Sequence, residues 1–106
     1  MWPVVVHPEA TEFLNKLETA TQLKARNCLV LLRDYGPLLR QPHSKKITGY
    51  KNLFELRTSG NSPVRLFYTH FQSKFYILHG FIKKTNKTPI REIEYAVKRQ
   101  ALLTSI

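Results

Sequence analysis

Two arginines in neighbouring segments are the residues most able to do chemistry in this sequence. Arg57 ends the stretch Phe54-Glu55-Leu56-Arg57, and Arg65 lies in the next stretch, Val64–Tyr68. If both stretches are adjacent strands, the two guanidinium groups project from one face of a sheet. Such a pair can hold a phosphate through forked hydrogen bonds. Glu55 is either a general base or the counterion that orients Arg57, and we favour the counterion.

Strand alternation puts three further side chains on the same face. These are Phe67, His79 and Phe81. The phenylalanines could stack on unpaired bases, or lie under the 38–51 segment or a partner protein. His79 is the best candidate for a proton-transfer group, because an unperturbed imidazole titrates near neutrality. A histidine on a strand is, however, more often simply packed or exposed.

Positive charge is concentrated in one half of the chain. The net charge is +10, and eleven of the seventeen Lys and Arg residues fall between Arg40 and Arg91, with Glu55 as the only carboxylate there. A polyanionic partner offsets the repulsion within such a field. The pattern favours a nucleic-acid surface, RNA in particular, over a solvated basic surface with no specific role. The expected RNA-binding lysines are Lys45, Lys46, Lys83 and Lys87, and Lys84 is expected to assist catalysis.

Other chemistries have little support. The four histidines lack the spacing of metal ligands, so we expect no metal site and no cofactor. Cys28 lies in an apolar helical context and is expected to be an inert core thiol. The sequence has no apolar run of membrane-spanning length and no signal-peptide pattern. We therefore expect one cytoplasmic domain over residues 1–106.

The hydrophobic spacing predicts the elements that must position these residues. It indicates a strand over 2–7, a helix over 8–20, a second helix from a cap at Thr21 to Gly36-Pro37, strands over 52–58, 64–69 and 75–82, and a helix from Thr88-Pro89. Residues 38–51 are expected to form an exposed loop. The order β-α-α-β-β-β-α predicts an α+β fold, a mostly antiparallel twisted sheet with helices packed on one face. The expected core face carries Phe54, Leu56, Val64, Leu66, Tyr68, Tyr76, Leu78 and Ile82.

Several of these segments resemble the RelE/HigB toxin family, and the phage-derived Gp49-like, HigB-type branch in particular. The resembling segments are Phe54–Arg57, Val64–Tyr68, Ile77–Pro89 and Arg91–Ile93, and the run from His79 to Pro89 is the most specific part. The resemblance covers residues 2–99. It implies a RelE-like fold and a toxin of a type II toxin–antitoxin system. Such toxins cleave mRNA in the ribosomal A site without metal and are inhibited by a cognate antitoxin, often a helix-turn-helix protein.

By matching position, the resemblance implies that Arg57 and Arg65 contact phosphate. It also implies that the lysines at 83, 84 and 87 form a basic cluster and that Lys45 and Lys46 help to hold ribosome-bound RNA. Residues 98–106 lack the Tyr, Asp or His that several family members use for proton transfer. Two alternatives therefore stay open: a ParE-like inhibitor of DNA gyrase with the same fold, and an RNA-binding module without catalytic activity.

Overall fold

The computed structural model describes residues 1–104 and contains three α-helices and five strands. In chain order these are β1 (Val4–Val6), α1 (Pro8–Asn15), α2 (Thr19–Tyr35), a short 3₁₀ turn η1 (Gly36–Leu38), β2 (Ser44–Lys46), β3 (Phe54–Arg57), β4 (Val64–Phe71), β5 (Lys74–Ile82) and α3 (Ile90–Thr104). Glu18, rather than the expected Thr21, caps α2. Within the described residues, no helix is long and apolar enough to cross a membrane.

All five strands form one sheet, in the order β1-β5-β4-β3-β2. β1 runs parallel to β5, whereas the other neighbours are antiparallel. The α+β class and the mostly antiparallel sheet are therefore confirmed. The prediction of an irregular loop over 38–51 is wrong at β2, a polar Ser-Lys-Lys segment without strand propensity. Its pairing with β3 makes it a strand, so here the tertiary partner overrides the local sequence.

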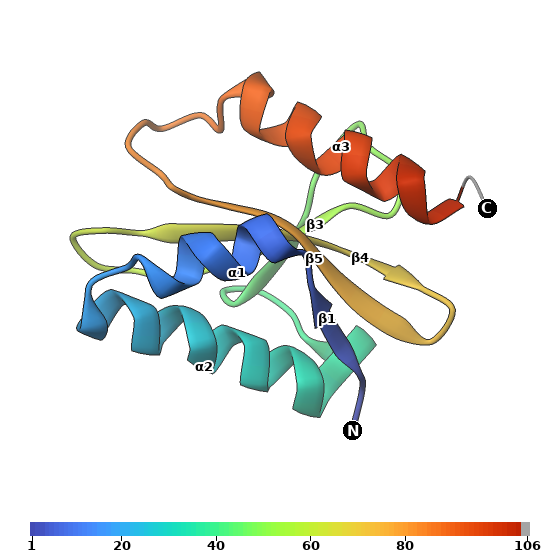
Figure 1. Cartoon of the computed structure of the whole chain (residues 1–106), viewed down its shortest axis with the longest axis horizontal. Coiled ribbons are helices and arrows are strands. Elements are labelled where there is room, and N and C mark those ends of the chain that lie inside the picture. Colours follow the sequence, from blue (N-terminus) through green and yellow to red (C-terminus); the bar gives the residue numbers. More distant parts are fainter. Residues whose placement is uncertain (105–106) are drawn as a thin grey trace.

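The helices cover both faces of the sheet, not one. α1 and α2 lie on one side and α3 lies on the other (Figure 1). Each side has its own apolar cluster, centred on Leu14, Leu32 and Leu66 under α1 and α2, and on Phe67 and Phe81 under α3. The expectation that all helices pack on a single face is wrong. Both faces of the sheet carry large apolar side chains, and a helix must pack on each face to bury them away from water.

A bulge in the β4–β5 pair changes which side chains share a face. Phe67 lies opposite His79, but Tyr68 lies opposite Ile77, so Leu78 is the extra residue. As a result, Tyr76 and Leu78 join the cluster under α3, whereas Ile77 joins the cluster under α1 and α2. The predicted place of Tyr76 and Leu78 on the same face as Val64 is therefore wrong, since simple alternation cannot register a bulge.

The first helix begins at a titratable cap. His7 Nδ1 accepts a hydrogen bond from the Glu9 amide at 3.1 Å. Burial, and then the nearby Arg99 charge, lower the pKa of His7 below its ordinary value of 6.5. The unfolded chain therefore binds this proton more readily than the folded chain does, and protonation costs stability as the pH falls through about 6.5.

We expect His7→Asn to reduce the loss of stability on acidification. Asparagine keeps a cap acceptor but does not titrate. Between about pH 7 and about pH 5, the free energy of unfolding should fall more steeply for the wild type than for the variant. Urea denaturation at both pH values measures this difference. Parallel pH profiles for the two proteins would contradict the assignment.

Candidate nucleic-acid interface

The pairing of the strands places the two arginines side by side. Arg57 of β3 lies directly opposite Arg65 of β4, which in turn lies opposite Phe81 of β5. On the outer side of β3, the Arg57 amide donates to the His43 carbonyl at 2.9 Å. Since adjacent strands are about 5 Å apart, these four residues form a continuous row across the sheet. The predicted arrangement of the arginines on one face is thus present.

A buried carboxylate lies next to this row. Glu55 Oε1 is 3.4 Å from Arg57 Nε and 3.9 Å from Arg65 Nε, and the Glu55 side chain is only 5% exposed. Arg65 is 9% exposed and Arg57 is 29% exposed. One carboxylate therefore lies against two guanidinium groups, and the three side chains together keep a net positive charge.

Backbone contacts fix the orientation of Arg65. One terminal nitrogen donates to the carbonyls of Thr58 and Val64, at 2.9 and 3.1 Å. Burial and the neighbouring Arg57 charge lower the pKa of Arg65, and Glu55 opposes this effect. Arg65 is thus a fixed, desolvated donor, whereas Arg57 is the more accessible member of the pair.

The charged group keeps unused hydrogen-bonding capacity. Arg57 Nε and Arg65 Nε lie within ion-pair distance of Glu55 but in poor hydrogen-bond geometry, so both lack a hydrogen-bond acceptor, and Glu55 Oε2 lacks a donor. Buried polar atoms of this kind are uncommon in folded proteins and call for an explanation. An anion at the arginines would supply the missing acceptor.

A cavity of about 420 Å³ opens beside the two arginines. His43 lines it, is exposed, and has no hydrogen-bond partner for its ring among residues 1–104. Sequence analysis missed His43 because it precedes β2 in a segment expected to be a loop. Only the pairing of that segment with β3 brings the imidazole to the arginines. The other lining residues are Pro42, Thr58, Ser59, Gly60 and Pro63.

The α3 helix closes the opposite half of this sheet face. Phe67 is fully buried and Phe81 is 7% exposed, and both pack against α3 residues. The expectation that these two rings lie on an open face and stack on bases is wrong. Because α3 covers β4 and β5, the rings form part of an apolar core.

His79 lies on the expected face but beneath the same helix. Its side chain is 14% exposed, and Nε2 lies 2.7 Å from Glu92 Oε1. Its ring is near Phe67, Phe81 and Tyr95. His79 does not line the arginine cavity, so these contacts connect it to α3 rather than to the arginines.

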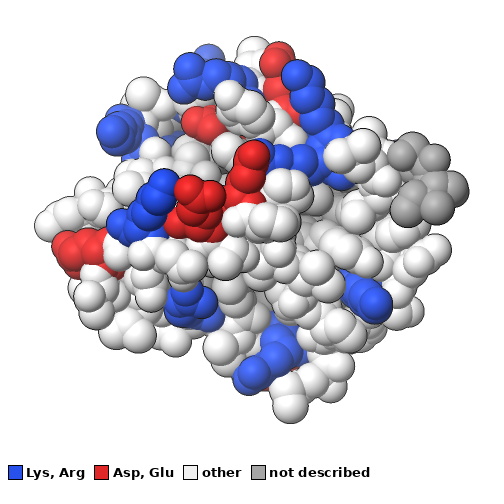
Figure 2. All heavy atoms as spheres, in the orientation of Figure 1, with Lys and Arg blue, Asp and Glu red and all other residues white. Residues whose placement is uncertain are grey.

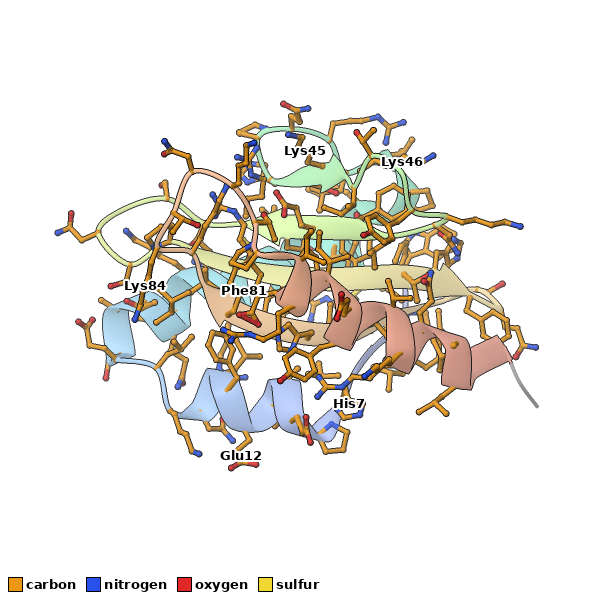
Figure 3. The ribbon with its side chains drawn as sticks, turned by 90° about the horizontal axis from the view of Figure 1, so that it is seen from above. His7, Glu12, Lys45, Lys46, Phe81 and Lys84 are labelled. Carbon is orange, nitrogen blue, oxygen red and sulfur yellow. The ribbon has the colours of Figure 1, made fainter. Side chains whose placement is uncertain are left out.

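The lysines divide between the β2 edge of the sheet and the segment that follows the interior strand β5. Lys45 lies opposite Glu55 in the β2–β3 pair, so it shares the arginine face, whereas Lys46 lies opposite Phe54. Figure 3 shows both lysines at one edge of the molecule, with His7 and Glu12 at the other. Lys84 lines a separate cavity with Arg91 and Glu92, beside the end of β5. The structure therefore does not bring Lys84 to the Arg57–Arg65 cavity.

The segment after β5 keeps its cationic side chains exposed. Lys84 and Lys87 are exposed and Lys83 is half-buried. Acidic side chains gather elsewhere, over α1 and the beginning of α3 in the view of Figure 2. Within residues 1–104, no group of three or more His, Cys, Asp or Glu side chains could hold a metal ion.

The fold and the cavity together define a small α+β domain with two arginines side by side at a cavity. A family model described as phage derived protein Gp49-like matches residues 12–101. The chain therefore belongs to the Gp49-like family. A comparison with curated proteins found no match.

Two solved structures share the fold. One is an E. coli RelE toxin carrying two arginine-to-alanine substitutions, in the free state: TM-score 0.68, 17% identity, with 92% of this chain and 96% of that chain covered. The other is the isolated E. coli RelE toxin: TM-score 0.63, 16% identity, with 94% and 99% covered. The fold is RelE-like over nearly the whole of both chains, as the sequence resemblance implied.

We expect Arg65→Ala to destabilise the domain more than Arg57→Ala. Removing Arg65 leaves Glu55 buried beside a single, more exposed guanidinium and takes the side-chain donor from the Thr58 carbonyl, whereas the Val64 carbonyl keeps the Thr58 amide as its donor. The free energy of unfolding should fall by about 3 kcal/mol for Arg65→Ala and by about 1 kcal/mol for Arg57→Ala. Urea denaturation measures both changes.

Neutralising the carboxylate provides the control. Glu55→Gln introduced into the Arg65→Ala variant should restore part of the lost stability, because the buried charge is removed. Equal stability losses for the two arginine variants, or no recovery with Glu55→Gln, would show that the stability of the domain does not depend on pairing Glu55 with Arg65.

Proposed function

We propose that this chain is the toxin of a toxin–antitoxin pair and that it cleaves mRNA in the ribosomal A site. Membership of the Gp49-like family and the RelE-like fold support the toxin assignment. A cavity with two guanidinium groups and a free imidazole supports the cleavage reaction. The expected partners are the ribosome, its bound mRNA and a cognate helix-turn-helix antitoxin, all in the cytoplasm.

The paired arginines are the observation that carries this proposal. A phosphodiester at Arg57 and Arg65 would receive donors from both guanidinium groups, and the buried Glu55 would hold those groups in place. Fixed positive charge of this kind stabilises negative charge that develops on a phosphate during its reaction. The Arg65 side chain does not need to move as this charge develops, because the strand pairing and the Thr58 carbonyl already orient it.

RNA brings its own nucleophile to such a site. The 2′-hydroxyl oxygen attacks the adjacent phosphorus, the bond from phosphorus to the 5′-oxygen breaks, and a cyclic phosphate and a free 5′-hydroxyl result. A base removes the 2′ proton, and an acid protonates the leaving oxygen. We assign one of these transfers to His43, the imidazole that lines the arginine cavity.

The remaining cationic and aromatic residues take supporting roles in this proposal. Lys45 and Lys46 at the β2 edge, with Lys83, Lys84 and Lys87 after β5, would hold RNA phosphates around the site. We assign a positioning role to His79, because its contact with Glu92 fixes the first turns of α3. Phe81 lies beside Arg65 and Phe67 lies beside Glu55 in the strand register, and both rings belong to the core under α3, so neither is assigned a base-binding role.

We expect Arg57→Ala and His43→Gln each to reduce mRNA cleavage on translating ribosomes by about 100-fold. Both side chains line the open cavity and neither is deeply buried, so the variants should fold. Primer extension on mRNA from a translation reaction detects the new ends, and growth after induction measures toxicity. Lys98→Ala, an exposed charge on α3, is the matched control and should behave as the wild type.

Other outcomes would redirect the assignment. If His79→Gln abolished cleavage and His43→Gln did not, the proton-transfer role would belong to His79 instead of His43. Arrest of DNA replication with intact mRNA would indicate gyrase inhibition. Retained RNA binding with no cleavage by the wild type would indicate a binding module, and unchanged cleavage by Arg57→Ala would refute the arginine site.

A further inference from the structure

We propose that α2 carries a subsite for the RNA nucleotide next to the phosphate held by the arginines. In this subsite, Lys24 contacts that nucleotide's own phosphate and Asn27 contacts the edge of its base. The inference rests on the proposed function, because it requires an RNA strand at Arg57 and Arg65. Sequence analysis placed no functional residue on α2.

A second cavity lies beside the first. It has a volume of about 260 Å³ and shares His43, Arg57, Thr58 and Ser59 with the arginine cavity. The two cavities are therefore continuous around the end of β3. The second one is completed by α2 residues, namely Lys24, Asn27, Cys28 and Leu31. A strand that leaves the arginines in this direction must run along α2.

Lys24 lies where the two cavities meet. Its Nζ is 2.9 Å from the position that a Cβ would take on Gly60, and Gly60 lines the arginine cavity. Lys24 is exposed and forms no ion pair among the described residues. An unpaired ammonium group at this position would meet the next phosphate along the strand, one nucleotide from the scissile one.

Asn27 gives the second cavity the means to distinguish bases. Its carboxamide carries both a donor and an acceptor, and both are free within residues 1–104. Leu31 and the largely buried Cys28 form an apolar wall next to it. An apolar wall with one amide at its rim suits a base that has left its stack, because the base ring is covered while its edge is hydrogen-bonded.

The chemistry of the groove favours RNA over an acidic peptide. Lysine alone would suit either ligand. The amide beside an apolar wall, and the continuity with a site that holds a phosphodiester, favour a nucleotide. The same nucleotide chemistry is present in mRNA and in ribosomal RNA. We commit to the strand held at the arginines, and the experiment below separates the two sources.

Binding of single-stranded RNA oligonucleotides of different length tests the subsite. We expect the Lys24→Ala/Asn27→Ala variant to bind a hexanucleotide roughly tenfold more weakly than the wild type does. The loss for a dinucleotide should be smaller, because a dinucleotide can place a base beside Asn27 but lacks the second phosphate that Lys24 would contact. The dependence of log K on log salt should decrease by about 0.7, the value for one lost contact to single-stranded phosphate. Hexanucleotides that differ only in the base next to the arginine-bound phosphate should differ less in affinity for Asn27→Ala than for the wild type.

Matched controls separate this inference from the proposed function. Lys16→Ala removes the exposed lysine that caps the C-terminal end of α1 and pairs with Glu12, and it should leave both affinities unchanged. Arg57→Ala should weaken both oligonucleotides; if it weakens neither, the proposed arginine site fails. If it weakens both while the α2 double variant behaves like Lys16→Ala, the subsite alone is wrong. If the α2 variant loses affinity for empty ribosomes but not for the hexanucleotide, its contact is with ribosomal RNA and the subsite is also wrong.

Discussion

The structure depends on one buried carboxylate held between two guanidinium groups. Glu55 is almost fully enclosed, and a charge in that position is tolerated only when cationic donors lie close to it. This requirement ties β3 to β4, because Arg57 comes from the first strand and Arg65 from the second. One carboxylate cannot balance two guanidinium groups, however, so the protein gains an oriented positive charge at a cavity. The same three side chains thus join the two strands and leave positive charge at the cavity.

The position of α3 decides how much of the sheet can meet a ligand. The helix covers β4 and β5, and Arg99 donates to the Leu78 carbonyl at 2.7 Å and forms an ion pair with Glu9. The aromatic half of the face is therefore a closed core. The basic half, at the ends of β2, β3 and β4, stays open at a cavity that no α3 residue lines. A face that looks uniform in the sequence is therefore divided into a half that α3 covers and a half that carries the two arginines.

Much of the fold follows from local patterns in the sequence. The alternation in Phe54–Arg57 and Val64–Tyr68 predicted adjacent strands with both arginines on one face, and the register bears this out. The apolar spacing before Gly36 predicted the second helix, since a left-handed glycine there ends it. These patterns could not predict which helix packs on which face of the sheet, because an amphipathic helix packs equally well on either apolar face.

The sequence by itself determined the elements other than β2, the concentration of positive charge between residues 40 and 91, and the neighbouring arginines. Each of these depends on residue types and short spacings, which act through local geometry. Tertiary structure decided the rest. It placed α3 over Phe67 and Phe81, inserted the bulge at Leu78, and brought His43 and the α2 side chains to the arginines. Those contacts join segments far apart in the chain, and they form only when strand pairing and core packing are satisfied together.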